Sequence, residues 1–128
     1  MELRKVTPIA IVEAIEPSLD FWVERLGFER VVEVPHGDVL GFVLLRHDGA
    51  EVMIQTRASV EADLEVLTAP TDRCVCVFYF DVDSIDSITE ALAGFEVVVG
   101  ERKTFYGARE IYYREPGGHI VGFAQSDV

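Results

Sequence analysis

The segment SLDFWVERLGFERVV at residues 18–32 recurs in altered form as SIDSITEALAGFEVVV at residues 84–99. The copies are 66 residues apart at their first serines and 67 residues apart at their glycines. Each contains a short amphipathic stretch, a Gly-Phe-Glu triplet and a run of valines. Self-similarity at a fixed spacing indicates that one supersecondary unit occurs twice in the chain.

Both copies predict a helix that ends at a glycine. The apolar positions repeat every three or four residues, as on one helix face: Leu19, Trp22, Val23 and Leu26 in the first copy, and Ile85, Ile88 and Leu92 in the second. Pro17 suits the first turn of the first helix, and Asp83 or Ser84 can cap the second. Gly27 and Gly94 suit the left-handed position that follows a helix, so we expect a positive φ at both.

Strand-like segments precede and follow each helix. We expect strands at residues 9–15, 29–34, 39–46 and 51–56 in the first half, and at 74–82, 96–99, 109–114 and 119–125 in the second. Asp-Gly at 48–49 and Pro-Gly at 116–117 supply turn chemistry between the last two strands of each half. The sequence therefore predicts an α+β fold of two βαβββ modules, whose eight strands form a cupped mixed sheet with the helices on its convex face.

The chain is long enough for one domain. We expect residues 1–57 to form module one, residues 58–73 to link the halves, and residues 74–128 to form module two. Helices on one sheet face leave the other face free to curve, which predicts a ligand cavity lined from both modules. The cup could close within one chain or between two. Its strand edges need covering, so we expect a homodimer.

The charge balance argues against some partners. Eleven basic and twenty-three acidic residues give a net charge of −12, whereas nucleic-acid phosphates require a basic footprint. An acidic surface is compatible with a cationic ligand, although a role in solubility alone is the more common reason for it.

The distribution of apolar residues argues against a membrane partner. The longest apolar run, residues 74–80, is too short to cross a bilayer, and residues 1–8 lack the apolar core of a secretory signal. We therefore expect a cytoplasmic protein. In that compartment we expect Cys74 and Cys76 to be reduced, and their apolar surroundings predict that they are buried.

Two stretches resemble the vicinal-oxygen-chelate superfamily, which includes glyoxalase I, ring-cleaving dioxygenases, fosfomycin-resistance enzymes and bleomycin-resistance proteins. They are SLDFW through LGF at residues 18–28 and YYREPGGH through FAQ at residues 112–125. The second is similar to the family's aromatic-rich strand, its D-P-x-G hairpin and its final strand. The resemblance covers nearly the whole chain and implies the two-module fold. It is less specific for function, because these motifs are turns and packing positions.

The enzymes of the superfamily hold a divalent metal with His, Glu or Gln side chains from four strands. The resemblance puts Thr7, Gln55, Val77 and Gly122 at those positions, with the register near Gln55 open between it and Met53. Of the four, only Gln55 is a plausible metal ligand, and one ligand is not a site. We therefore expect no metal and no other cofactor.

The three histidines do not change this expectation. His47 and His119 fall in or beside hairpin turns, and His36 lies in a turn-like stretch between two strands. No two of them have a spacing that places both on one face of a strand or helix. We expect all three to be solvated turn residues, with His47 and His119 on the outside of the cup.

The candidate ligand-binding residues are mainly aromatic. Strand alternation places Tyr112 and Tyr113 on opposite faces, and we favour Tyr112 as the one that faces the cup. Phe105 precedes that strand in a loop, which suits the rim of the cup or, alternatively, a cap against a neighbouring chain. Phe42 is a candidate for the opposite wall, and ordinary core packing accounts for it equally well.

Two polar residues complete the candidate site. Glu110 is on the same side of its strand as Tyr112 and Arg114. A pair between Glu110 and Arg114 would orient a ligand or, alternatively, be an exposed pair that contributes little. Gln55 is included as the polar candidate from the first module.

The missing metal ligands favour the metal-independent members of the superfamily. Bleomycin-resistance proteins are such members, and the chain shares their small size, their acidity and Thr7-Pro8 in the opening strand. We therefore expect a metal-independent protein that binds and sequesters a small organic molecule, as in antibiotic resistance, rather than an enzyme. One alternative is a glyoxalase-like lyase or isomerase with a non-standard site around Gln55, His36 and Glu110. Another is an interaction module whose cup is filled by side chains.

Overall fold

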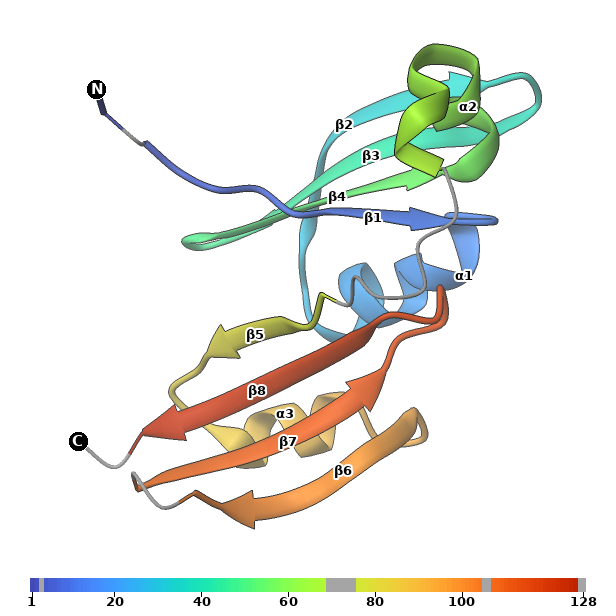
Figure 1. The fold of residues 1–128 in the computed structure, drawn as a ribbon. Coiled ribbons are helices and arrows are strands. Elements are labelled where there is room, and N and C mark those ends of the chain that lie inside the picture. The colour runs from blue at the N-terminus through green and yellow to red at the C-terminus, as the bar shows by residue number, and fades with distance from the viewer. Residues whose placement is uncertain (3, 69–75, 105–106, 127–128) are drawn as a thin grey trace.

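The structure is a computed structural model, and it describes residues 1–2, 4–68, 76–104 and 107–126 (Figure 1). In chain order its elements are β1 (Ile9–Val12), α1 (Glu16–Leu19), η1 (Asp20–Arg25), β2 (Glu29–His36), β3 (Val39–His47), β4 (Ala50–Thr56), α2 (Arg57–Leu64), η2 (Glu65–Thr68), β5 (Phe78–Asp81), α3 (Ile85–Ala91), β6 (Glu96–Lys103), β7 (Ala108–Arg114) and β8 (Ile120–Ser126). The order confirms the predicted α+β class and the repeated βαβββ unit. None of the helices in these ranges is long and apolar enough to span a membrane.

The eight strands form two mixed sheets of four, in the equivalent orders β1-β4-β3-β2 and β5-β8-β7-β6. In each sheet the first and last strands of the module pair in parallel, and the other neighbours are antiparallel. Figure 1 shows α1 and η1 between the two sheets and α3 beside the second sheet. The second half of the chain thus repeats the strand pairing of the first.

The aromatic residues of the first helix form a core that both modules share. Phe21 and Trp22 are fully buried. The Trp22 ring lies 5.2 Å from Phe28 in the first module, and 6.0 Å from Phe78 and 5.9 Å from Phe80 in the second, between ring centroids. Burial of large aromatic side chains is a major source of stability, so the two modules share their strongest packing.

The first helix differs from the regular α-helix that its apolar spacing predicts. It starts as one α-helical turn and continues as a π-helix over Asp20–Arg25. The backbone N–H of Leu26 donates to the carbonyl of Phe21, five residues earlier, at 3.1 Å. The adjacent Phe21 and Trp22 lie in this wider turn, and both are completely buried.

Each sheet has a core face, toward the shared aromatic cluster, and an outer face, away from it. In the first sheet, Val43 and Ile54 pair across β3 and β4 and are fully buried on the core face. The adjoining pair, Phe42 and Gln55, therefore lies on the outer face. Helix α2, which follows β4 in the chain, contacts β1, β3 and β4.

The expected alternation holds in β7. Tyr113 is 2% exposed on the core face, where its ring lies 6.1 Å from that of Phe123. Tyr112 is half-buried and lies on the outer face.

The two cysteines were expected to be buried in a long strand. Cys76 is exposed, which corrects that expectation. The physical reason is that β5 begins only at Phe78, so Cys76 precedes the sheet. Cys74 lies outside the described residues.

Both helix-terminating glycines have the predicted left-handed backbone, with φ of +82° at Gly27 and +95° at Gly94. Gly94→Ala is expected to lower the free energy of unfolding by about 1 kcal/mol. Nothing lies within 4 Å of the position of a Cβ at Gly94, so the loss comes from the backbone conformation alone.

Gly49 is the matched control, because it also has open space around its Cβ position but no positive φ. Gly49→Ala should change stability by less than about 0.5 kcal/mol or improve it. Urea denaturation of both variants measures the difference, and equal effects would contradict the conformational explanation.

Candidate functional site

A polar and aromatic group lies on the outer face of the second sheet. Strand β7 supplies Glu110 and Tyr112, β5 supplies Tyr79, and β6 supplies Arg102. The Glu110 side chain is 1% exposed, and its carboxylate accepts a 2.7 Å hydrogen bond from the Tyr79 hydroxyl and pairs with the Arg102 guanidinium. We call these four residues the tyrosine cluster.

A glycine on β8 makes room for both rings of the tyrosine cluster. Gly122 pairs with Tyr112 on one side and with Tyr79 on the other. A Cβ at Gly122 would lie 2.5 Å from Cε2 of Tyr112 and 3.2 Å from Cδ1 of Tyr79. The two rings therefore lie against bare backbone, with their centroids 6.2 Å apart and a 41° tilt between them. Tyr79 is 49% exposed, so the pair presents an aromatic surface to the exterior.

The tyrosine cluster keeps its carboxylate ionised. Burial alone would raise the pKa of Glu110, but hydrogen bonds from Tyr79 and Arg102 and the charge of Arg102 together lower that pKa below its ordinary value. Glu110 is thus a buried, ionised carboxylate on the outer face of the sheet. Such groups concentrate at functional sites.

The lowered pKa has a definite consequence for stability. A carboxyl group with a lowered pKa stabilises the fold fully above its unfolded-state pKa of about 4.3, and that contribution is lost as pH falls through the folded-state pKa. Glu110→Gln is therefore expected to destabilise the protein by about 1–2 kcal/mol at pH 7. The difference in the free energy of unfolding between this variant and the unmodified protein should shrink once the pH is lowered below about 4.

Urea denaturation at several pH values measures this dependence. Glu96→Gln is the control, because Glu96 forms an exposed pair with Arg114 at 3.3 Å and should contribute about 0.5 kcal/mol or less. A Glu110→Gln effect that does not vary with pH would contradict the assignment of an ionised carboxylate.

The structure places the predicted site residues in two groups. Phe42 and Gln55 face each other across β3 and β4, and the Gln55 amide donates to Ser59 Oγ of α2 at 3.0 Å. Glu110 and Tyr112 lie together on the second sheet. Phe105 lies outside the described residues.

The predicted pair between Glu110 and Arg114 is not formed. The register of β6 and β7 places Arg114 opposite Glu96 and Glu110 opposite Arg102, and the charges pair accordingly. Arg102 was not among the predicted site residues, because the strand that begins at Glu96 was expected to end at Val99, whereas β6 continues to Lys103.

Tyr79 was also missed, although the sequence carries a signal for it. It is the polar aromatic between Phe78 and Phe80, and alternation turns it away from those two core residues.

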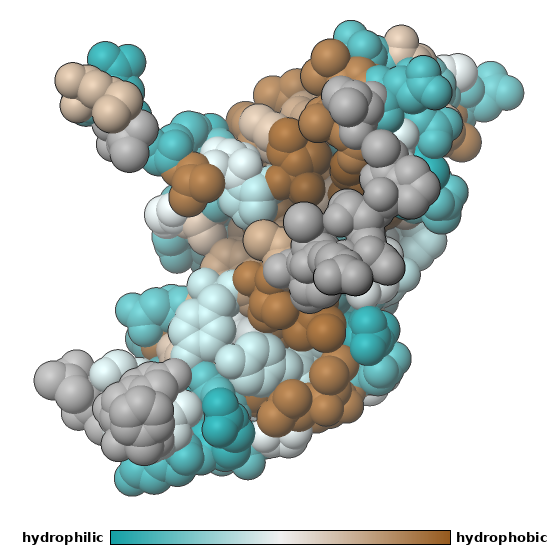
Figure 2. Space-filling model, viewed as in Figure 1, coloured by the Kyte–Doolittle hydropathy of each residue, from teal (hydrophilic) through white to brown (hydrophobic). Residues whose placement is uncertain are grey.

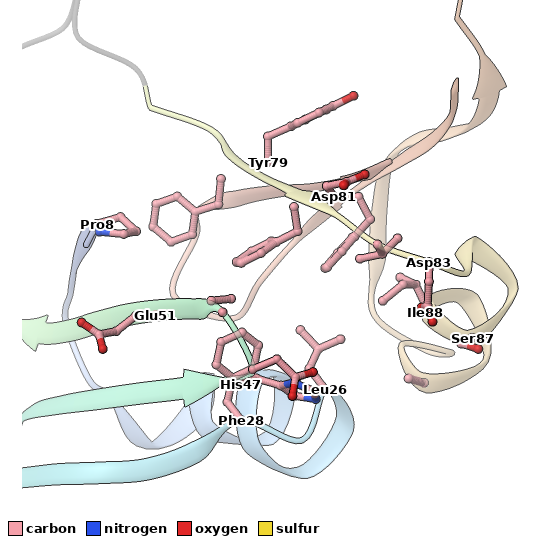
Figure 3. A pocket seen from close by; sticks show the side chains of 18 of the residues that line it. Pro8, Leu26, Phe28, His47, Glu51, Tyr79, Asp81, Asp83, Ser87 and Ile88 are labelled. Atoms are coloured by element: carbon pink, nitrogen blue, oxygen red, sulfur yellow. The ribbon is translucent and has the colours of Figure 1, made fainter. Parts of the chain in front are cut away.

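A cavity of about 930 Å³ opens between the two modules (Figure 3). Its walls come from the turn between β3 and β4, the end of the first helix, β5 and α3. In Figure 3 Leu26, Phe28 and His47 lie on one side of it, and Tyr79 projects away from it. Both modules line the cavity, but it adjoins Phe78 and Phe80 on the core side of β5. None of the predicted ligand-binding residues that the structure describes lines it.

One histidine differs from the solvated turn residue that was expected. His119 is half-buried, its Nε2 lies 2.9 Å from the carbonyl oxygen of Ile11, and its ring stacks on Phe78 at 6.1 Å. His119 thus joins the two modules. The contact spans 108 residues of chain, and the local turn pattern at His119 carries no signal for it. His36 is exposed, as expected, and His47 lines the cavity.

The residues at the family's metal positions do not fit a metal ion. The Tyr112 and Tyr79 rings occupy the space beside Gly122, and Val77 supplies no ligand atom. The hydroxyl of Thr7 donates to Glu51 at 2.8 Å, and Gln55 is bonded to α2. Within the described ranges, no group of three or more His, Cys, Asp or Glu residues is arranged to hold a metal ion.

The geometry does not assemble the alternative lyase site either. Gln55 and His36 belong to the first sheet, where His36 is the last residue of β2, whereas Glu110 belongs to the second sheet. Glu110 is already bonded to Tyr79 and Arg102.

Solved structures share this fold over almost the whole chain. A glyoxalase/bleomycin resistance protein/dioxygenase from Nocardioides is 19% identical with a TM-score of 0.75, covering 98% of this chain and 85% of that one. TioX from Micromonospora sp. ML1 is 16% identical with a TM-score of 0.76, covering 95% and 98%. TnmS3, an antibiotic binding protein from Streptomyces sp. CB03234, is 22% identical with a TM-score of 0.70, covering 99% of each chain. At these identities the likeness shows the fold alone.

No curated protein matches the chain in sequence. The family model of the glyoxalase/bleomycin resistance protein/dioxygenase superfamily does match, over residues 6–123. This match takes in both modules and the tyrosine cluster. The chain therefore belongs to the glyoxalase/bleomycin resistance protein/dioxygenase superfamily.

Proposed function

We propose that the protein is a metal-independent, cytoplasmic small-molecule-binding protein that sequesters an organic ligand of antibiotic type on the outer faces of its sheets. The observation that carries the proposal is the tyrosine cluster. Tyr79 and Tyr112 offer an aromatic surface, and a stacked aromatic contact is worth about 0.5–1.5 kcal/mol beyond area burial. The fold likeness to TnmS3, an antibiotic binding protein, supports an organic ligand.

The ligand that suits this surface is planar in part and has polar groups at its edge. Its ring stacks on the two tyrosines, and the Tyr79 phenol oxygen, whose proton is donated to Glu110, can accept a hydrogen bond from its polar edge. A net charge of −12 favours a ligand with cationic character. Phe42 and Gln55 belong to the other sheet, so in this proposal they form the opposite wall only where a second copy of the chain brings them across the tyrosine cluster.

A second copy of the chain covers the outer faces in this proposal, which makes the protein a homodimer. Hydrophobic side chains gather on the side of the molecule shown in Figure 2. The exposed hydrophobic residues of the outer faces include Ile9, Val34 and Val99, whose exposed fractions are 50%, 47% and 39%. In addition, every residue of the edge strands β2 and β6 is exposed. Contiguous apolar patches and free strand edges are usually covered by a partner.

A thermal-shift screen of planar antibiotics tests the binding function. A ligand present at 100 times its Kd stabilises the protein by about 2.7 kcal/mol, which is a readily measured shift. A smaller shift in Tyr112→Ala at the same ligand concentration supports the outer-face site.

Two further measurements test the rest of the proposal. Stoichiometric zinc, nickel, manganese or iron retained through purification would overturn metal independence. Sedimentation at micromolar concentration is expected to show twice the chain mass of 14.3 kDa, and a monomer would contradict the dimer.

The packing of both tyrosines on Gly122 makes a specific prediction. Gly122→Ala is expected to destabilise the protein by about 1–3 kcal/mol, because the added methyl group forces the rings off β8. In a Tyr112→Ala background the closest clash is gone, so the same substitution should have a much smaller effect. A double-mutant cycle by urea denaturation measures the coupling. Additive effects would show that Tyr112 does not rest on Gly122.

A further inference from the structure

Strand β5 presents side chains of different chemistry on its two faces. Its Tyr79, which projects away from the cavity in Figure 3, belongs to the tyrosine cluster on the outer face, whereas Phe78 and Phe80 line the cavity between the modules. The alternation of side chains along a strand is the cause. A molecule in the cavity would therefore touch a set of side chains different from the one that the tyrosine cluster offers.

The walls of the cavity are apolar and incompletely covered. Phe28 and Phe78 belong to the core and are almost completely buried, at 6% and 8% exposed. Leu26, Phe80 and Ile88 pack against that core but are only partly buried. An apolar body seated against them would remove this surface from water, which is favourable. The volume of about 930 Å³ lies within the range of pockets that bind drug-sized molecules.

The basic side chains at the cavity are committed to other contacts. The Arg25 guanidinium donates to the carbonyl oxygen of Ala93 at 3.1 Å and lies over the Phe95 ring, 5.1 Å from its centroid. His47 Nδ1 lies 3.1 Å from the Asp48 carboxylate. Neither group is therefore available as the main partner of an anion.

The acidic side chains at the mouth of the cavity differ in whether a basic side chain neutralises them. Glu51 is bonded to Lys5 and Arg46, and so is neutralised. Asp81, the last residue of β5, and Asp83, which lies near Ile88 in Figure 3, also line the cavity, and neither forms a salt bridge with another residue that the structure describes. The cavity thus combines an apolar wall with unneutralised carboxylates at its mouth.

We propose that this cavity is a second binding site, for an amphipathic organic cation with an aromatic or branched apolar body. The body lies against Phe28 and Phe80, and the cationic nitrogen lies beside Asp83. The site goes beyond the proposed outer-face function and does not depend on it, because no residue of the tyrosine cluster other than Tyr79 lines the cavity.

The test uses berberine, a planar fluorescent quaternary cation, and the anionic dye 8-anilinonaphthalene-1-sulfonate as its counterpart. Titration is carried out on the full chain and on Tyr112→Ala, which removes part of the outer-face surface. A saturable berberine site of unchanged affinity in Tyr112→Ala is expected, with weaker binding of the anionic dye, whereas any berberine bound on the outer face should be weakened in that variant. Loss of berberine binding in Tyr112→Ala, or tighter binding of the anion, would overturn the proposal.

Variants of the cavity complete the experiment. Ala50→Trp fills it and should weaken berberine binding by about tenfold or more. Asp83→Asn should weaken it by about two- to fivefold, and Asp38→Asn, in an exposed turn of module one, should leave it unchanged. If Ala50→Trp does not fold by circular dichroism, Ser87→Trp on the exposed rim replaces it. Unchanged affinity in the filled variant, or equal losses in both aspartate variants, would refute the cavity as the site.

Discussion

Tyr113→Ala is expected to lower the free energy of unfolding by about 3–5 kcal/mol, the range for truncation of a large buried aromatic. Tyr113 is 2% exposed and packs edge-on against Phe123 in the core of the second module. Tyr112→Ala, one residue earlier, should lower it by only about 1 kcal/mol, since this side chain is half-buried on the outer face.

Ligand binding should respond in the reverse order. Tyr112→Ala removes a stacking surface and should weaken binding of the outer-face ligand several-fold, by about 0.5–1.5 kcal/mol. Denaturant titration and ligand titration of both variants separate stability from binding. If Tyr113→Ala lost binding and Tyr112→Ala lost stability, β7 would be out of register by one residue.

Trp22→Ala is expected to have a comparable or larger effect on stability, about 3–5 kcal/mol. Trp22 is fully buried and contacts Phe28 in one module and Phe78 and Phe80 in the other. Because typical domains are stable by about 5–15 kcal/mol, the variant should be close to unfolding at 37 °C. Far-UV circular dichroism during urea denaturation measures the loss.

Two control variants help to interpret the result. Trp22→Phe keeps most of the aromatic volume and should lose about 1–2 kcal/mol. Val31→Ala, at an exposed position of β2, should change stability by less than about 0.5 kcal/mol. A Trp22→Ala protein as stable as Val31→Ala would show that the first helix does not hold the modules together.

The features that the sequence predicted well are local ones. A helix stop requires a positive φ at one residue, which glycine supplies, so Gly27 and Gly94 could be placed from the chain alone. Strand alternation is equally local, and it correctly put Tyr112 and Tyr113 on opposite faces of β7. The repeat then extended these assignments from one half of the chain to the other.

The features that the sequence did not reveal depend on contacts between distant segments. The partner of Glu110 is set by the register of β6 against β7, and an irregularity in that register places Arg102 opposite it instead of a nearer residue. The environment of His119 depends on β1, at the other end of the chain. The cavity likewise exists only where the two modules meet, so no single segment indicates it.

Trp22 is the only tryptophan of the chain, and it lies where aromatic side chains of both modules converge. Its fluorescence is therefore a built-in optical reporter of the contact between the modules. An indole shielded from water emits at shorter wavelengths than a hydrated one, so separation of the modules would shift the emission to the red. Recorded beside the circular dichroism signal of the strands, this shift shows whether the two halves part before either unfolds.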